Sequence, residues 1–329
     1  MLALVRKLLR SKGARDTLPS AATRCTRLMP ASLALGFAGW VCLASPSVAQ
    51  DLSGTLKKIK ETGSITIGHR DASIPFSYYD DKQQPVGFAL DICSHVVEAT
   101  KAELKLSKLD VQFALVTSAN RIPLMANGTV DLECGSTTNN IERQKQVSFT
   151  NSHFVTASRY VTKKTSNIAQ IDDLKGKTVV STAGSTNIKQ LNDVNTQRQL
   201  GINIVPANGH AEAFLMVETD RAVAFVMDDI IIAGLVASSK TPEAYHLPSG
   251  AFSLPEPYGI MLRREDPDFK RVVDAATAKL YKSSEIEKLY TKWFQSPIPP
   301  RGLNLNLAMS PALKKAFAHP TDSGDPTSY

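Results

Sequence analysis

The stretch VDLECGSTT, residues 130–138, decides the fold because it joins a buried strand directly to a run of small polar side chains. Its first five residues are mostly apolar and predict a short β-strand, whereas its last four are Gly, Ser and Thr. The same succession recurs along the chain, where apolar strand patterns lead into Arg70, Thr186 and Asp228. Polar side chains are therefore expected at the carboxyl ends of several strands.

Helical patterns follow these strands, so the two kinds of element alternate. Such alternation predicts an α/β fold with mainly parallel sheets. Ligands of these sheets bind at the carboxyl ends of the strands, where the polar clusters lie. We expect strands at 64–68, 111–116, 130–134, 178–181, 202–205, 222–227 and 258–262, and helices at 86–99, 120–125, 230–237, 267–281, 284–294 and 311–318 and from about 188.

Residues 1–49 have the pattern of a secretory signal peptide. Seven Lys and Arg residues precede an apolar stretch at 33–44. The small residues Ser47 and Ala49 occupy the −3 and −1 positions of the expected cleavage site. The alternative is a membrane anchor, but the apolar stretch is shorter than the roughly 20 residues that span a membrane. We predict cleavage after Ala49, export to the periplasm and a soluble mature protein.

The basic character of the whole chain comes largely from this segment. Seven of the 38 Lys and Arg residues and one of the 31 Asp and Glu residues precede Gln50, which leaves 31 basic and 30 acidic residues and a net charge of +1. This balance gives no indication of the basic surface that binds nucleic acids and other polyanions. We therefore expect no nucleic-acid partner.

The four cysteines divide between the two parts of the chain. Cys25 and Cys42 belong to the predicted signal peptide, whereas Cys93 and Cys134 would reach an oxidising compartment that permits a disulfide. Their spacing is not that of a zinc or haem site. A disulfide and a pair of buried thiols are both compatible with the sequence.

Short polar and aromatic motifs stand in a definite order along 51–320. The most specific is CGSTTNN at 134–140 with ERQ at 142–144. The others are GHR at 68–70, IPFSYY at 74–79, TSANRIPL at 117–124, NGT at 127–129, DLKGK at 173–177, GH at 209–210, RAVAF at 221–225, MDD at 227–229, KWF at 292–294 and NLN at 304–306. With these motifs the sequence resembles the family 3 periplasmic amino-acid-binding proteins, which are the receptors of ABC importers, and among them the glutamate/aspartate-binding proteins.

The resemblance implies the type II periplasmic-binding-protein fold, an α/β Venus-flytrap of two lobes whose chain crosses the hinge twice. We expect the crossings near Ser158 and Pro255. Lobe 1 would comprise 51–157 plus 256–329, and lobe 2 would comprise 158–255.

The same resemblance implies an extracytoplasmic solute-binding protein that captures L-glutamate or L-aspartate and delivers it to the permease subunits of an ABC importer. We expect a monomer with no cofactor, no metal ion and no catalytic residue. The two amino acids differ by one methylene, and the sequence does not rank them.

The family pattern also assigns the α-carboxylate and α-ammonium groups of the ligand. Arg143 would clamp the α-carboxylate with its planar fork of donors, and Ser136, Thr138 and Thr186 would add contacts. Thr186 stands before a helix whose positive end favours anions. Asp228 would pair with the ammonium. The structural alternatives are a solvated surface arginine and, for Asp228, a helix cap.

Arg70, Ser118, Arg121 and His210 would hold the side-chain carboxylate of the ligand. A lone histidine is more often structural, and His210 gains its role only from the family match. Three arginines against Asp228 give the pocket a net charge of +2, which suits an acidic amino acid and repels a basic one.

Two other functions remain as alternatives. A dehydratase of the same fold is one, and Ser118, His210 and Asp228 could be arranged on paper as a hydrolase triad. The Gly-x-Ser-x-Gly motif and the Gly-rich phosphate-binding motifs are absent from the sequence, so we expect no enzyme. The other alternative is a sensory or ligand-presenting receptor module.

Overall fold

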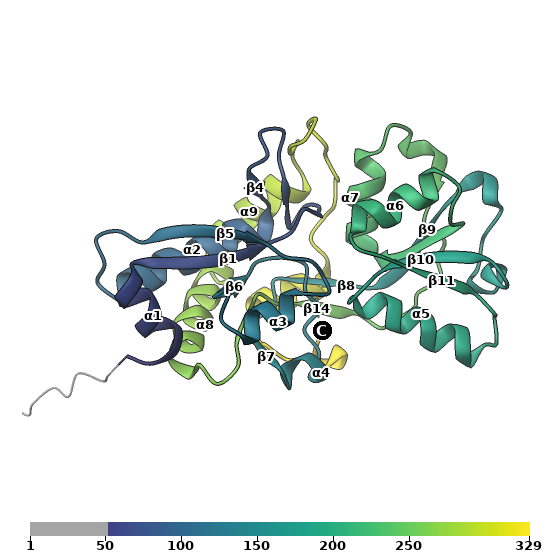
Figure 1. The fold of residues 1–329 in the computed structure, drawn as a ribbon. Coiled ribbons are helices and arrows are strands. Elements are labelled where there is room, and N and C mark those ends of the chain that lie inside the picture. Colours follow the sequence, from purple (N-terminus) through teal and green to yellow (C-terminus); the bar gives the residue numbers. More distant parts are fainter. Residues whose placement is uncertain (1–51) are drawn as a thin grey trace, which may run out of the picture. The chain divides into compact units, whose positions relative to one another are not determined.

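The computed structural model describes residues 52–329, so the predicted signal peptide, its cleavage point after Ala49, and Cys25 and Cys42 lie outside the described residues. Residues 52–329 contain two five-stranded β-sheets with helices packed against them (Figure 1). We call these the first and the second sheet.

The first sheet has a parallel centre in which β1 pairs with a strand on each side. Ile65 and Ile67 of β1 are buried in the core that the helices cover. Its strands, in spatial order, are β5 (Asp110–Leu115), β1 (Ser64–His69), β6 (Leu132–Glu133), β15 (Met261–Arg263) and β7 (Val147–Phe149). The helices in the same part of the chain are α1 (Gly54–Thr62), α2 (Phe88–Glu103), α3 (Arg121–Ala126), α4 (Ile141–Gln144), α8 (Pro267–Tyr281), α9 (Ser284–Phe294) and α10 (Pro311–Ala318). A small sheet consists of β2 (Ala72–Ser73), β3 (Ser77–Tyr79) and β4 (Pro85–Val86).

The second sheet repeats this plan. Its central strand β12 is buried at all five residues, as expected of a strand covered on both faces. Its strands, in spatial order, are β11 (Asn203–Ala207), β10 (Thr178–Thr182), β12 (Ala224–Asp228), β9 (Ser158–Lys163) and β13 (Tyr245–His246). Its helices are α5 (Thr186–Gln197), α6 (His210–Glu218) and α7 (Asp229–Ser238). Short 3-10 helices occupy Lys164–Ser166, Ile171–Leu174, Pro242–Ala244 and Pro326–Ser328.

Two further strands carry the chain between the sheets. β8 (Phe154–Thr156) leads almost directly into β9, and β14 (Glu256–Tyr258) pairs with β8 in the antiparallel direction. The sequence predicted one strand at 258–262, but β14 and β15 are separate strands of different sheets. Gly259 lies between them, where a Cβ atom would come within 3.0 Å of the Phe149 ring. The chain therefore turns from the crossing pair into the first sheet at a position where a side chain would crowd the Phe149 ring.

Both sheets are mixed, so the prediction of mainly parallel sheets is wrong. β1 is parallel to β5 and β6, and β10 is parallel to β11 and β12, whereas β7, β9, β13 and β15 pair in the antiparallel direction. β7, β9 and β15 are neighbours of the crossing strands in the sequence. They enter or leave a sheet without the crossover helix that a parallel connection requires.

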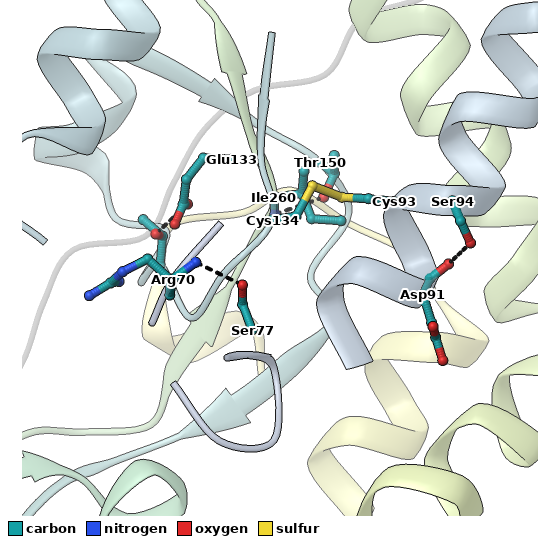
Figure 2. The surroundings of a disulfide bond; sticks show 10 residues. Arg70, Ser77, Asp91, Cys93, Ser94, Glu133, Cys134, Thr150 and Ile260 are labelled. Atoms are coloured by element: carbon teal, nitrogen blue, oxygen red, sulfur yellow. Dashed lines mark hydrogen bonds between the residues drawn. A yellow bond between two sulfur atoms is a disulfide. The ribbon is translucent and has the colours of Figure 1, made fainter. Parts of the chain in front are cut away.

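A disulfide joins Cys93 of α2 to Cys134, the residue after β6 (Figure 2). Both cysteines are fully buried. This decides between the two alternatives that the sequence left open. It also ties the segment that continues into Ser136 to a core helix.

The C-terminal residues pack beside the first sheet. The side chain of Asn139 donates to the backbone oxygen of Asp322 at 2.8 Å, and the hydroxyls of Ser152 and Tyr329 lie 2.6 Å apart. Within residues 52–329, no helix combines the length and the apolar character of a membrane span.

Candidate functional site

The nine residues predicted to bind a ligand all lie at or beyond the carboxyl ends of strands. Eight are buried, and Thr186 is partly exposed. On the first sheet Arg70 follows β1, Ser118 and Arg121 follow β5, and Ser136, Thr138 and Arg143 follow β6; on the second sheet Thr186 follows β10, His210 follows β11 and Asp228 ends β12.

A narrow pocket lies between these two sets of strand ends. Seven of the nine residues line it, namely Ser118, Arg121, Ser136, Thr138, Thr186, His210 and Asp228. Its volume is about 10 Å³. This is room for about one water molecule, so the side chains from the two sheets nearly meet.

Arg70 and His210 form one end of the cluster. The Nη2 atom of Arg70 donates to the Ser118 hydroxyl at 2.8 Å and lies 3.4 Å from Nε2 of His210. Burial lowers the pKa of Arg70 to about 10, and the positive charge of Arg121 acts in the same direction. Arg70 remains cationic at neutral pH, and its Nε and Nη1 atoms are buried without a hydrogen-bond partner among the described residues.

The surroundings of His210 determine which of its nitrogens carries the proton. Burial holds its pKa well below the ordinary value, and the charges of Arg70 and Arg121 lower it further, so the ring is neutral. Since Arg70 can only donate, Nε2 of His210 must accept. Nδ1 then carries the hydrogen and donates to the Thr182 hydroxyl at 2.8 Å.

Arg121 begins α3 and is 3% exposed. Burial lowers its pKa, whereas the negative charges of Glu133 and Asp228 oppose that change. Its Nε atom lacks a hydrogen-bond partner in residues 52–329. The structure thus places a desolvated cation with unused donor capacity at the pocket wall.

Arg143 is 8% exposed, so it is not a solvated surface arginine. Its backbone N–H donates to the Asn140 side chain at the start of α4, and Nη1 donates to the Thr138 backbone oxygen at 2.8 Å. Nη2 reaches the Gly184 oxygen at 3.3 Å, across to the second sheet. Burial lowers the pKa of Arg143 to about 9, which still leaves it cationic at neutral pH.

Thr186 is the first residue of α5, two residues earlier than the sequence predicted. Ser185 caps the helix by accepting from the Ile188 N–H at 3.2 Å. The Thr186 hydroxyl lies 3.4 Å from that of Thr138, its counterpart on the first sheet. The N–H groups of this first turn give the start of α5 a partial positive charge, which favours an anion there.

Asp228 directs its carboxylate away from helix α7. It makes no side-chain capping bond there, although it occupies the capping position. Instead Oδ1 accepts from the Asn187 side chain at 2.8 Å and Oδ2 accepts from the Tyr258 hydroxyl. Burial raises the pKa of Asp228, and the bonds from Asn187 and Tyr258 counteract that rise. The capping interpretation is therefore wrong, and the carboxylate is held at the pocket.

The sequence analysis missed Glu133, a fully buried acid in β6. The Thr137 hydroxyl donates to its Oε2 at 2.6 Å, and Glu133 lies near Arg70 (Figure 2). The negative charge of Glu133 raises the pKa of all three site arginines against the effect of burial. The available signal was an acid within an otherwise apolar strand pattern.

Glu133 changes the charge count. Three arginines against Asp228 and Glu133 leave a net charge of +1, so the value of +2 expected from the sequence is wrong. Glu256 is nearby, but burial raises its pKa to about 8, and the charge of Asp228 adds to that rise. It is mostly protonated at neutral pH and does not enter the count.

Residues 65–296 match the family described as bacterial extracellular solute-binding proteins, family 3. The chain is 53% identical over 281 residues to the L-glutamate/L-aspartate-binding protein of Pseudomonas aeruginosa, covering 85% of this chain and 93% of that protein. It is 44% identical over 294 residues to the glutamate/aspartate import solute-binding protein of Escherichia coli, covering 89% and 97%.

Solved structures extend this similarity to the fold. A mutant of ArgBP from T. maritima is 27% identical, with a TM-score of 0.65 and coverage of 73% of this chain and 99% of that one. The predicted fold class, two α/β lobes of the type II binding-protein kind, is thereby confirmed.

Proposed function

The chain belongs to the family 3 bacterial extracellular solute-binding proteins, and from this premise we propose that it captures L-glutamate or L-aspartate for an ABC importer. The pocket at the strand ends is the proposed binding site. The ligand is the one that the relatives from P. aeruginosa and E. coli are named for. The extracellular character of the family supports export, with the periplasm as the proposed location.

One observation carries the choice of an acidic ligand. Arg70, Arg121 and Arg143 are each at most 8% exposed. Arg121 lines the small pocket together with Asp228, whereas Arg70 and Arg143 lie behind its wall and bond to the lining residues Ser118 and Thr138. Buried charges are costly unless they are matched. An acidic amino acid matches them, because it brings two carboxylates and one ammonium and its net negative charge balances the pocket.

The proposed roles follow from where the donors lie. Arg143, Ser136, Thr138 and Thr186 would bind the α-carboxylate, and Asp228 would bind the ammonium. Arg70, Ser118, Arg121 and His210 would bind the side-chain carboxylate. Neutral His210 fits this corner because it adds no fourth positive charge. To donate to the ligand carboxylate its ring would take the tautomer with the hydrogen on Nε2, and Nδ1 would then accept from the Thr182 hydroxyl.

The proposed mechanism is closure of two lobes around the ligand. We assign lobe 1 to 51–157 plus 256–329 and lobe 2 to 158–255, since each five-stranded sheet takes its strands from one of these parts. An amino acid does not fit a pocket of about 10 Å³, so access requires the lobes to separate. Bending at the β8–β14 pair, the proposed hinge, would separate them. Permease subunits would then distinguish the closed form from the open one.

We further propose that the protein acts as a monomer and without catalysis. The relatives are named as binding and import proteins, which supports a transport role rather than an enzymatic one. The near-neutral charge of the chain beyond Ala49 supports a small-molecule ligand rather than a nucleic acid.

Calorimetric titration of the purified, ligand-stripped protein with the common amino acids tests the function. We expect L-glutamate and L-aspartate to bind at least about a hundredfold more tightly than L-glutamine and L-asparagine, whose amides leave an arginine unmatched. Binding of L-arginine or L-lysine in preference to these acids would overturn the proposal.

Gly184→Ala tests closure, and we expect it to weaken L-glutamate binding about tenfold. Gly184 has a φ of +74°, and a Cβ atom there would lie 2.6 Å from Cα of Ala119 and 2.7 Å from the Ser118 backbone oxygen. These backbone atoms belong to the opposite lobe, so the added methyl group would hold the lobes apart.

Gly176→Ala is the matched control for Gly184→Ala. Its φ is +68°, so it introduces similar backbone strain, but a Cβ atom there meets nothing within 4 Å. Its affinity for L-glutamate should equal that of the unaltered protein. Equal affinities for both variants, measured by the same titration, would contradict the closure contact.

A further inference from the structure

Glu133 is a buried carboxylate that has no part in the proposed binding of the ligand. It is fully buried in β6, and the Thr137 hydroxyl donates to its Oε2 at 2.6 Å. Its Oε1 atom is buried without a hydrogen-bond partner in residues 52–329. Leaving a carboxylate oxygen in this condition is costly, so the surrounding charge must compensate.

The backbone is shaped to bring Glu133 close to Arg70. At the intervening Gly135, a Cβ atom would lie 2.4 Å from Oε1 of Glu133 and 3.0 Å from Cγ of Arg70. Figure 2 shows the Glu133 and Arg70 side chains near one another, on the strand ends next to the disulfide. A larger residue at Gly135 would force the Glu133 carboxylate to move from this position.

Three arginines in one buried cluster repel one another. Arg121 lowers the pKa of both Arg70 and Arg143, and Glu133 is the acid that counteracts the effect of burial in all three. Asp228 is occupied by Asn187 and Tyr258 on the other side of the pocket. Glu133 is thus a fully buried acid on the arginine side of the pocket, and its charge acts on all three arginines.

We propose that Glu133 is a specificity-determining residue: a built-in counter-charge that sets the net charge of the ligand the pocket accepts. The inference rests on the proposed function. It goes further because Glu133, which is given no contact with the ligand, would cause the pocket to reject ligands with two net negative charges. With Glu133 the pocket carries +1 and an acidic amino acid neutralises it; without Glu133 it would carry +2.

The consequence depends on ligand charge. Removing one buried negative charge favours each ligand in proportion to the net negative charge that it brings, because the Coulomb energy scales with that charge. L-Glutamine is neutral overall, L-glutamate carries one negative charge, and glutarate, which lacks the amino group, carries two. The cost of leaving Asp228 without an ammonium partner applies to glutarate before and after the substitution and cancels in the comparison.

The experiment measures the dissociation constants of these three compounds for the unaltered protein and for Glu133→Gln, with displacement titrations for the weak ligands. We expect the ratio of the glutarate to the L-glutamate constant to fall about tenfold or more in the variant. The ratio of the L-glutamine to the L-glutamate constant should rise by a similar factor. If Glu133→Gln does not fold, Glu133→Met provides the same neutral substitution.

Asp131→Asn is the matched control. Asp131 is also fully buried and adjoins the same strand, and its replacement by Asn removes the same charge. Asp131 pairs with Lys58, and it is not among the acids that shift the pKa of the three site arginines. This variant should lower stability and leave both ratios unchanged. A uniform change in all three constants for the Glu133 variant, or no change, would overturn the inference. Failure of the unaltered protein to bind L-glutamate and L-aspartate would instead overturn the proposed function.

Discussion

Arg121→Ala should weaken binding of L-glutamate and L-aspartate by about 2 to 5 kcal/mol, the range found when one member of a buried charge pair is removed. Arg121 lines the pocket, is 3% exposed and has an Nε atom without a hydrogen-bond partner in the described part of the chain. Without it the side-chain carboxylate of the ligand would be desolvated and poorly matched. The loss for L-glutamine should be smaller, because its amide carries no charge.

Calorimetric titration of Arg121→Ala with both acids and with L-glutamine measures this effect. Arg271→Ala removes an arginine of the same charge from the surface, where it pairs with Glu103, and should leave the affinities unaltered. Thermal unfolding of both variants separates binding from folding. Unchanged affinity of Arg121→Ala for L-glutamate would refute the role given to this arginine.

The helices show which parts of the fold are local properties of the sequence. The bounds expected for 267–281 and 284–294 coincide with α8 and α9. Pro267 occupies the first turn of α8, and the Ser283 side chain caps α9. These signals act within a few residues of the chain and can be recognised without tertiary structure.

Strand partners, in contrast, depend on residues far away in the sequence. Residues 258–262 form a continuous apolar pattern, and nothing local reveals that Tyr258 pairs with β8 while Met261 pairs with β6 and β7. The mixed direction of the sheets escaped prediction for the same reason. Both features follow from the double crossing of the chain.

The candidate site divides in a similar way. Arg70 stands out because a cation directly after an apolar strand is unusual, and Asp228 stands out as an acid at a strand end. Arg121 and Arg143 lie in helices beyond the strands, and only the family motifs point to them. Glu133 and Tyr258 lie inside strand patterns, where a polar group reads as a core residue. Only the spatial arrangement shows that Glu133 lies near Arg70 and that the Tyr258 hydroxyl holds Asp228.

Loss of the Cys93–Cys134 disulfide should lower the free energy of unfolding by about 4 kcal/mol, from the chain entropy that the cross-link removes from the unfolded state. The bond closes a loop with a sequence separation of 41 and lies in the core. Urea denaturation with and without a reducing agent measures the change. The double variant Cys93→Ala with Cys134→Ala should unfold at a lower urea concentration and should not respond to the reducing agent.

Loss of the disulfide should lower stability with little effect on ligand affinity. The Arg121→Ala substitution should instead lower ligand affinity, because Arg121 acts on the ligand. Cys134 lies between Glu133 and Gly135 and thus holds the start of the site segment to α2 (Figure 2). That segment is also held by the bond from Thr137 to Glu133 and by the bond from Asn139 to Asp322, which survive reduction. The reduced protein, while still folded, should therefore bind L-glutamate within a few-fold of its original affinity. A urea midpoint that does not move on reduction, with loss of the disulfide verified by thiol counting, would contradict the stabilising role.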